Sequence, residues 1–444
     1  MKGLDLCEEL VRRATAMGAD EAEVYYLKTR KLEAVFEKND LQVPKGDTYE
    51  GVGVRVIRDR RQGFAATNVL TREVLDDTIS AAIAIATASP EDPNHYLPEP
   101  SEAKPVPGIY DEKASGVKLE NVLDLGRSFV EAARGYDRRV TIDSASFTAQ
   151  LSEEAVVNSK GVGVSQRGSA FTCVGMGFAR DGDDVSSFDV EYSASCVLSG
   201  IDPAAIGRRL GEKVVKSLGA TTIPSFKGAV IITPYAGPEL IGGPVKFSVN
   251  AENVQNGRSQ WKGKIGSKVA AELLSLVDDP RIPGGVGSTV FDREGVPPEP
   301  LQIIAGGTLN HYLHNCYTAR KEGRRSNGRA VGSDQSLPGI GTTNLVFAPG
   351  KTPLDEIIRS CSKGLMVNRF SGTLDPISGD FSGVVKGGHY IENGELARPV
   401  KEVMIAGNIY ELLHHITAVS REVVTLGDTR LPYVQIDGVS VTGK

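Results

Sequence analysis

Apolar residues in the first part of the chain follow two different spacings. Between residues 4 and 14 they recur at helical spacing, and Gly18 predicts the end of that helix. Residues 21–43 have the β-branched and aromatic content of two strands, and in residues 51–57 valines alternate with other side chains as in a strand. A second helix is predicted over residues 71–88, capped by its first residue, a threonine. The order helix, strands, helix predicts a compact unit of mixed α and β structure.

A proline-dense stretch over residues 89–108 separates this unit from the next one. Such a composition is typical of an extended linker or a loop that wraps the surface. After it, the pattern predicts a helix over residues 118–134, several alternating strands, and a helix over residues 202–218. Asp202 caps this last helix and a proline occupies its first turn.

From residue 227 to the C-terminus the chain is rich in strand patterns and in glycine. We expect two helices there, over residues 267–275 and 353–361. The organisation therefore predicts three domains: an N-terminal α/β domain (residues 1–105), a middle α/β domain (106–222) and a C-terminal β-rich domain (223–444).

Composition narrows the class of protein. The 444 residues are 40% hydrophobic and 24% charged, as in soluble globular proteins, and the formal net charge is −6. An acidic balance argues against a surface that coats nucleic acid, so we expect no direct nucleic-acid partner. The N-terminus lacks a signal-peptide core, and the longest apolar stretch, residues 79–88, is too short to span a membrane. We expect a cytoplasmic protein without a membrane partner.

The five cysteines form no CxxC pair, and their number is odd. Reduced, mostly buried thiols are the favoured interpretation.

Six histidines are present, but none has the HExxH spacing that places two imidazoles on one helix face. The nearest candidates, His311 and His314, follow a hairpin predicted at Gly306-Gly307. On an outgoing strand, residues three apart point to opposite faces, so ordinary packing or surface positions are favoured over a metal role.

Two groups of carboxylates and one basic run remain as candidate chemistry. Asp278-Asp279 and Asp292 with Glu294 are interpreted as surface turns. For the basic run at residues 319–330, a solvated loop ranks first. A loop that grips a peptide carboxylate through Arg324 or Arg325 ranks second, and a phosphate contact third.

Several short motifs occur in an order that resembles the TldD/PmbA family, also called the modulator-of-DNA-gyrase family. They include EGVGVRVI, KGKIGSKVAAELLSLVDD, FDREGVP, YTARKEGRRSNGRA, DPISGDFSG and IENGELARPV, and their order extends over nearly the whole chain. The resemblance implies an α+β fold, with an N-terminal α/β part whose helices lie on a mixed sheet. It also implies a C-terminal β-rich part of curved antiparallel sheets.

The TldD branch of this family is a zinc peptidase with an HExxxH helix and a late cysteine as metal ligands. Here the corresponding residues 240–253 contain no histidine, and the tail over residues 423–443 contains no cysteine. The chain therefore resembles the PmbA branch, also called TldE. The resemblance implies no cofactor in this chain, zinc in a TldD-type partner, a heterodimer (or a homodimer in isolation) and an unfolded peptide as substrate.

On this basis the chain is interpreted as the non-catalytic subunit of a zinc peptidase, with no catalytic residue of its own. Four polar residues in the segment that replaces the zinc helix are candidates for the peptide cleft: Asn253, Gln255, Asn256 and Arg258. The three amides can both donate to and accept from a peptide backbone, and Arg258 adds a positive charge for a carboxylate. Two alternatives stay open. The chain could be an autonomous metallopeptidase with displaced ligands, or a non-proteolytic modulator linked to gyrase.

Overall fold

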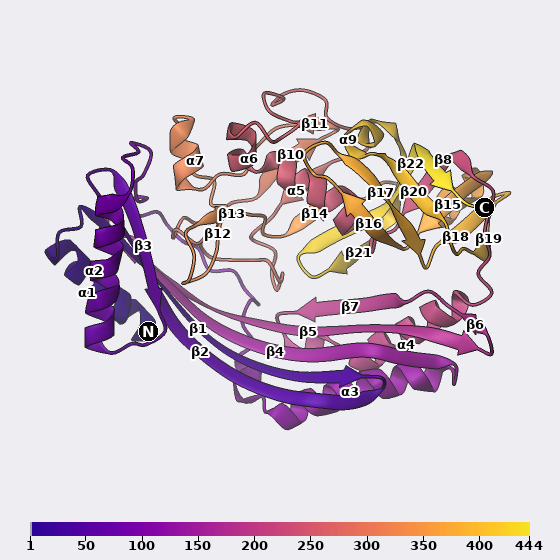
Figure 1. Ribbon diagram of the computed structural model, residues 1–444, viewed down its shortest axis with the longest axis horizontal. Coiled ribbons are helices and arrows are strands. Elements are labelled where there is room, and N and C mark those ends of the chain that lie inside the picture. The colour runs from indigo at the N-terminus through magenta and orange to yellow at the C-terminus, as the bar shows by residue number, and fades with distance from the viewer. Residues whose placement is uncertain (1) are drawn as a thin grey trace.

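The computed structural model describes residues 2–444, which fold into two large sheets (Figure 1). The first sheet has seven strands in the order β3-β2-β1-β4-β5-β6, with β7 beside β5, and its paired strands run antiparallel. Its strands are β1 (Glu21–Glu37), β2 (Asp40–Arg58), β3 (Arg61–Thr67), β4 (Val140–Asn158), β5 (Gly163–Asp181), β6 (Asp184–Val185) and β7 (Asp189–Ser195). Strands from both expected N-terminal domains therefore share one sheet, and the division into three domains stays a prediction.

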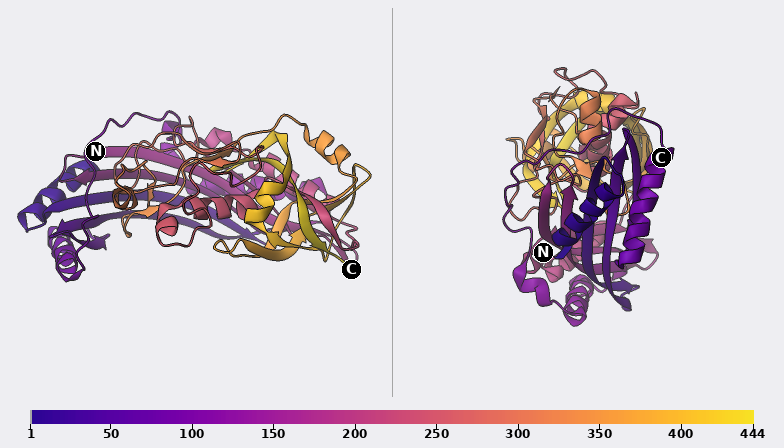
Figure 2. Two further views of the ribbon diagram at one scale, coloured as in Figure 1. Left: turned by 90° about the horizontal axis from the view of Figure 1, so that it is seen from above. Right: turned by 90° about the vertical axis from the view of Figure 1, so that its left-hand side faces the viewer.

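Four helices cover the outer, convex face of this sheet (Figures 1 and 2). They are α1 (Lys2–Ala16), α2 (Arg72–Ala88), α3 (Leu119–Tyr136) and α4 (Pro203–Lys216). Successive side chains of a strand point to opposite faces, and the even-numbered apolar residues of β1 belong to the cores under these helices. The odd-numbered residues of β1 face the other way, toward the C-terminal half.

The inner, concave face of the sheet carries charged and small residues where the C-terminal half rests on it. Glu23 of β1 lies opposite Arg55 of β2, and both are buried. A Cβ at Gly53 would overlap the backbone of Asp334, so glycine is required for the C-terminal half to approach this closely. The inner face is thus built for contact with a second layer.

The proline-rich segment has no regular structure and lies along the molecule's surface, as the sequence predicts. It is fixed at several points: the Leu97 amide donates to Glu21, Asn158 donates to the Pro98 carbonyl, and Arg281 donates to the Lys104 carbonyl.

The second sheet has 13 strands, which run mostly antiparallel with two parallel pairs, β14 with β22 and β15 with β8. Its strands are β8 (Phe226–Ile232), β9 (Leu276–Asp278), β10 (Leu301–Ala305), β11 (Thr308–Leu309), β14 (Leu345–Phe347), β15 (Lys363–Val367), β16 (Arg369–Leu374), β17 (Asp380–Lys386), β18 (His389–Glu392), β19 (Glu395–Pro399), β20 (Met404–Asn408), β21 (Ile416–Leu426) and β22 (Thr429–Thr442). The α+β class is confirmed, although the parallel pairs lie in this sheet and not in the first.

Short elements complete the C-terminal half. They are a π-helical turn (Pro238–Gly242), α5 (Gly243–Val249), α6 (Ala251–Gln255), α7 (Cys316–Lys321), α8 (Leu354–Ser360), α9 (Ile409–Leu412), and a small sheet of β12 (Ala330–Val331) with β13 (Gly339–Ile340). Among the described residues no helix is long and apolar enough to cross a membrane.

Two predicted helices of this half had different outcomes. The helix over residues 353–361 is confirmed as α8. The helix over residues 267–275 is wrong, because its backbone bonds to the β10–β11 hairpin instead of to itself: Val269 donates to Gly307, and Gly307 donates to Leu274. The apolar residues that suggested a helix, such as Val269 and Leu274, are nevertheless in the core. All five cysteines are free and buried, as predicted.

Candidate peptide cleft

A continuous helical segment, the π-helical turn followed by α5, leads away from the end of β8. Leu240, Ile241, Val245 and Val249 are fully buried in the C-terminal core, so the face of this helix that packs against the sheet is aliphatic. Leu431 of β22 packs against its start, since a Cβ at Gly237 would lie 3.1 Å from the Leu431 side chain. The contact between the start of this helix and β22 is therefore apolar.

This arrangement does not fit zinc. A catalytic zinc site needs at least three nitrogen, sulfur or oxygen ligands from the protein. Within residues 2–444 no three histidine, cysteine, aspartate or glutamate side chains come together in a way that could hold a metal ion.

The structure places two of the predicted cleft residues in local packing. Asn253 is buried on α6, and its amide donates to the Phe247 carbonyl at 2.9 Å. The Gln255 amide donates to the Thr318 carbonyl at 2.8 Å and to Glu322 at 3.1 Å. These side chains connect α6 to α5 and α7.

The other two residues, Asn256 and Arg258, are exposed on the turn that ends α6. Gly257 adopts a left-handed conformation with φ of +72°, and the Arg258 amide donates to the Asn253 carbonyl at 2.8 Å. The Asn256 and Arg258 side chains point outward from a well-defined turn.

Arg324 and Arg325 are exposed in the loop after α7. The Arg324 guanidinium lies 3.3 Å from the Glu322 carboxylate, which also accepts from Gln255. The structure thus brings Gln255 and Arg324 together through Glu322, on the surface of the α6–α7 pair.

The predicted hairpin at Gly306-Gly307 is confirmed by β10 and β11, and the two histidines after it are far from equivalent. His311 is exposed and bonds the Gln302 carbonyl. His314 is buried, and its burial lowers its pKa to about 4, since the neighbouring Glu322 only partly offsets this effect. His314 is therefore neutral at physiological pH.

The carboxylates at residues 278, 292 and 294 are not in surface turns, and this prediction is wrong. All three are buried, as are Arg293 and Arg329, whereas only Asp279 is partly exposed. Asp278 pairs with Arg329, and Asp292 accepts from the amides of Glu294, Val296 and Ala330. Burial, and next the neighbouring Glu294, raise the pKa of Asp292 to about 7.

Glu294 and Arg293 extend into a buried charge network with the first sheet. The Arg55 guanidinium lies 2.6 Å from Glu23 and 3.0 Å from Glu294, and Arg293 lies 3.0 Å from Glu23. Glu294 also accepts from the Cys316 amide at 2.7 Å. Two guanidinium groups and two carboxylates thus fix the C-terminal half on the inner face of the sheet. The sequence signal for this network was the charged pair on the apolar strands β1 and β2.

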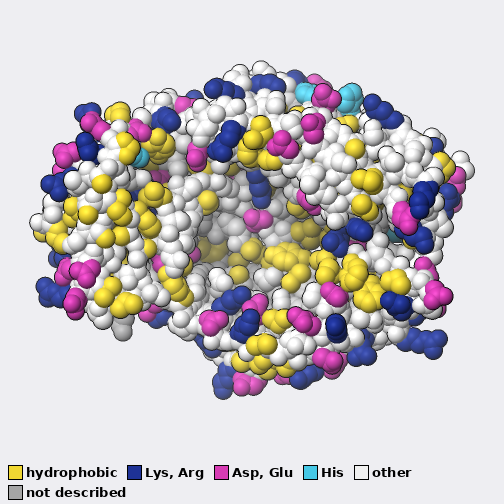
Figure 3. All heavy atoms as spheres, viewed as in Figure 1, with side chains coloured by type: hydrophobic (Ala, Val, Ile, Leu, Met, Phe, Trp, Pro, Cys, Tyr) yellow, Lys and Arg dark blue, Asp and Glu magenta, His cyan; other side chains and the backbone are white. Residues whose placement is uncertain are grey.

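A hollow lies between the inner face of the sheet and the C-terminal half (Figure 3). It contains three neighbouring cavities of about 210, 620 and 220 Å³, of which the second shares Gly287 with the first, and Val286 and residues 427–429 with the third. Their walls come from β1, β4, β7, the start of the π-helical turn, and the β21–β22 turn. Of the six predicted cleft residues, none lines any of these three cavities.

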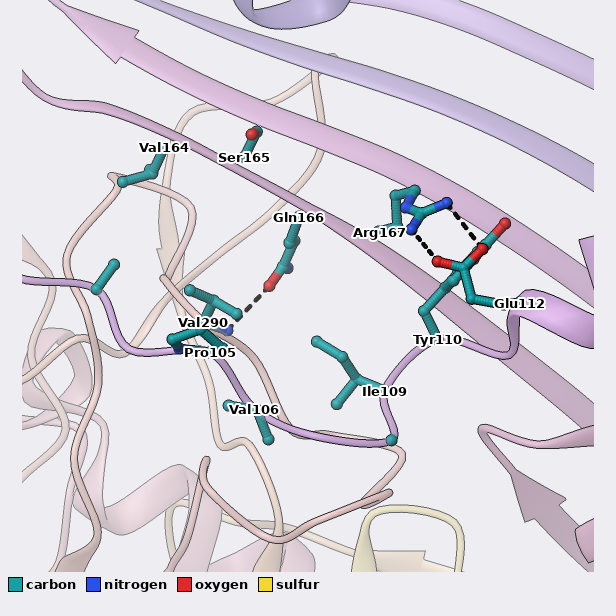
Figure 4. A pocket seen from close by; sticks show the side chains of 12 residues that line it. Pro105, Val106, Ile109, Tyr110, Glu112, Val164, Ser165, Gln166, Arg167 and Val290 are labelled. Atoms are coloured by element: carbon teal, nitrogen blue, oxygen red, sulfur yellow. Dashed lines mark hydrogen bonds and ion pairs between the residues drawn. The ribbon is translucent and has the colours of Figure 1, made fainter. Parts of the chain in front are cut away.

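A fourth cavity, of about 490 Å³, lies between the proline-rich segment and β5 (Figure 4). Its one arginine is satisfied within the chain, since Arg167 pairs with Glu112 and stacks on Tyr110. Gln166 accepts from the Val290 amide at 2.9 Å on the opposite wall. The polar groups of this cavity are thus directed at each other.

Comparison with known proteins places the chain in a family. Residues 22–86, 112–218 and 225–443 match the first domain, the central domain and the C-terminal domain of PmbA/TldA metallopeptidases. The metalloprotease PmbA of Escherichia coli O157:H7 is 25% identical over 98% of this chain and 96% of its own length. A TldD homologue of Haemophilus influenzae, named a metalloprotease, is 25% identical over 90% of this chain and 85% of its own.

Solved structures agree. A protein of Thermotoga maritima described as a putative modulator of a DNA gyrase has a TM-score of 0.90 and 27% identity, over 99% of both chains. TldE of Thermococcus kodakarensis also has a TM-score of 0.90, with 25% identity over 99% of this chain and 100% of its own. The motif order, the domain matches and the fold are consistent, and the chain belongs to the TldD/PmbA family of metallopeptidases.

Proposed function

We propose that this chain is a TldE-type subunit of a zinc peptidase that cleaves unfolded peptides, and that the metal is held by a TldD-type partner. The observation that carries the proposal is the helix after β8. Where the resemblance leads us to expect histidine ligands, this helix presents Ile241, Val245 and Val249 to a closed aliphatic core. No catalytic step is assigned to residues of this chain.

The hollow between the sheet and the C-terminal half supports a role in holding peptide. Strands border it, and an extended peptide can bond to strand backbones whatever its sequence. Asn256 and Arg258 are exposed and lie outside the three cavities, so we assign them to the surface that contacts the TldD-type partner.

The test uses the TldD-type chain from the same genome. Each chain alone and the mixture are incubated with an unstructured fluorogenic peptide, and assembly is followed by size-exclusion chromatography. We expect a 1:1 complex that cleaves the peptide, and no cleavage by this chain alone. Zinc-dependent cleavage by this chain alone would support the displaced-ligand alternative. A chain that neither assembles nor affects cleavage would favour the modulator alternative.

Asn256→Ala and Arg258→Ala test the part of the predicted segment that is free to contact a partner. For Arg258, loss of a charge-assisted contact at an interface weakens binding by about tenfold or more, and loss of the neutral Asn256 amide has a smaller effect. We expect both variants to fold normally and to reduce assembly or cleavage. If both assemble and cleave at the wild-type rate, this turn is only scaffold.

A further inference from the structure

The largest of the three cavities, of about 620 Å³, lies between β7 and the C-terminal half. Its volume is in the range of sites that hold small ligands or a few residues of peptide. One wall is apolar and includes Val190, Val286 and Leu426, and two tyrosines, Tyr192 and Tyr235, also line the cavity. Two cations complete the lining, Lys246 of α5 and Arg369 at the start of β16.

The Arg369 guanidinium acts on two nearby carboxylates, Asp189 and Glu239, where its charge opposes the rise in pKa that burial causes, but it forms no ion pair with either. Lys246 and Arg369 are both partly buried, and neither forms an ion pair with a carboxylate of residues 2–444. Arg369 donates one hydrogen bond, to the Phe188 carbonyl at 2.9 Å, and its guanidinium has further donors. Two partly desolvated cations on one cavity attract an anion more strongly than exposed ones would.

The buried carboxylates of neighbouring β7 are already satisfied. Glu191 lies 2.5 Å from the Lys213 ammonium and 3.4 Å from Arg209. Asp189 accepts from the Asn368 amide at 2.8 Å and from the Val190 amide at 2.7 Å. Burial raises the pKa of Asp189, although the charges of Lys213 and Arg369 act in the opposite direction.

Two further acidic side chains are near the cavity. Glu239, on the first turn of the helix, is exposed to solvent on one side. Partial desolvation of its carboxyl raises its pKa, and the nearby Arg369 charge acts in the opposite direction. Asp428 lines the cavity on the β21–β22 turn and accepts from the Thr429 hydroxyl at 3.0 Å. The lining therefore carries two positive charges, Lys246 and Arg369, and one negative charge, Asp428. The Asp428 carboxylate can also accept a hydrogen bond from a peptide amide.

The tyrosine wall is held in place before any ligand arrives. The Tyr235 hydroxyl donates to Glu191 at 3.0 Å, and the Lys213 ammonium lies 3.2 Å from the centre of the Tyr235 ring. A wall fixed in this way costs little conformational entropy on binding.

We propose that this cavity binds the C-terminal residue of a peptide, with its carboxylate on Lys246 and Arg369, its side chain against the apolar wall, and its amide toward Asp428. An anion, an apolar group and an amide donor, close together, are the chemistry of a chain end. The inference rests on the proposed function, because it assigns the end of the peptide that the subunit holds.

Binding to this chain alone tests the inference without any cleavage. Fluorescence anisotropy compares three labelled versions of one unstructured peptide: a free acid, a C-terminal amide, and an amide ending in glutamate. We expect amidation to weaken binding about tenfold, the value of one strong charge-assisted contact. Lys246→Met and Arg369→Gln should each weaken the free acid by a similar factor and leave the amide unchanged. Exposed Lys351→Met and Arg138→Gln serve as matched controls and should change neither.

Equal binding of the free acid and the amide would overturn the assignment. So would equal binding of the glutamate amide and the free acid, because a side-chain carboxylate would then suffice. These results are independent of the test with the TldD-type partner. If this chain binds the free acid and the amide equally while the mixture with the TldD-type chain still assembles and cleaves peptide, the pocket assignment fails and the subunit proposal stands.

Discussion

Two groups of charged residues between the first sheet and the C-terminal half differ in how their charges are paired. At one end, Glu23, Arg55, Arg293 and Glu294 are buried and each meets an opposite charge within 3.0 Å. At the other, Lys246 and Arg369 are only partly buried and form no ion pair within residues 2–444. The first place is closed by the C-terminal half resting on the sheet, and the second is open.

The difference separates charges that hold the fold from charges free to act on a ligand. A buried ion is costly unless it is paired, so removing one member of the closed network leaves its partner buried and uncompensated. An unpaired cation at a cavity wall makes no such contribution to folding. Mutations at the two places should therefore have effects of different size on stability.

The largest effect is expected from Arg55→Met. This change leaves Glu23 and Glu294 facing each other with one guanidinium, Arg293, between the two layers. We expect a loss of about 3–5 kcal/mol in the free energy of unfolding, measured by urea denaturation. Arg13→Met, which removes an ion pair with the partly exposed Asp76, is the control and should cost about 1 kcal/mol or less. Similar losses in both variants would remove the distinction between the network and the surface.

A pH-dependent effect of intermediate size is expected from His314. Its folded-state pKa of about 4 lies below its ordinary value, so the unfolded chain takes up the proton first as the pH falls. Stability from the neutral imidazole is complete above about pH 6.5 and is lost between about pH 6.5 and 4, by up to roughly 3 kcal/mol.

His314→Gln keeps a polar group but cannot take up this proton. In thermal melts across this pH range, we expect the wild type to lose more stability on acidification than the variant does. Parallel profiles would mean that His314 titrates normally in the folded chain. The comparison between the two proteins cancels the titration of other groups, such as Asp292.

The smallest effect on stability is expected at the open cavity. Lys246→Met and Arg369→Gln remove cations without breaking an ion pair, so each should change the free energy of unfolding by about 0.5 kcal/mol or less. Denaturation of the same samples used for peptide binding checks this. A loss of several kcal/mol would place these residues with the structural charges, and would weaken the case for a ligand.

Local patterns in the sequence predicted much of the fold. The alternation of Val52, Val54 and Val56 with Gly53 and Arg55 gave strand β2 and its two faces. Asp202 caps α4 as expected, and its carboxylate accepts from the Ala205 amide at 3.0 Å. Thr71, by contrast, precedes α2 without a side-chain cap.

Long-range contacts could not be predicted in the same way. The string Asp-Arg-Glu-Gly at residues 292–295 is typical of a surface turn, and it does form a turn. It is buried because Glu23 and Arg55, more than 200 residues earlier in the chain, present opposite charges to it. The cavity of about 620 Å³ could not be predicted from the sequence either, because β7, α5 and β16 come together only in the fold. In the sequence, Lys246 is a single lysine after a short apolar run.

The central claim is that this chain lacks a metal centre and depends on a partner for one. The most direct measurement is the zinc content of the purified full-length chain by mass spectrometry, after dialysis with and without added zinc. The account predicts far less than one zinc per chain in both samples, with no change in His311→Ala or His314→Ala. About one tightly held zinc per chain, lost on mutation of either histidine, would contradict it.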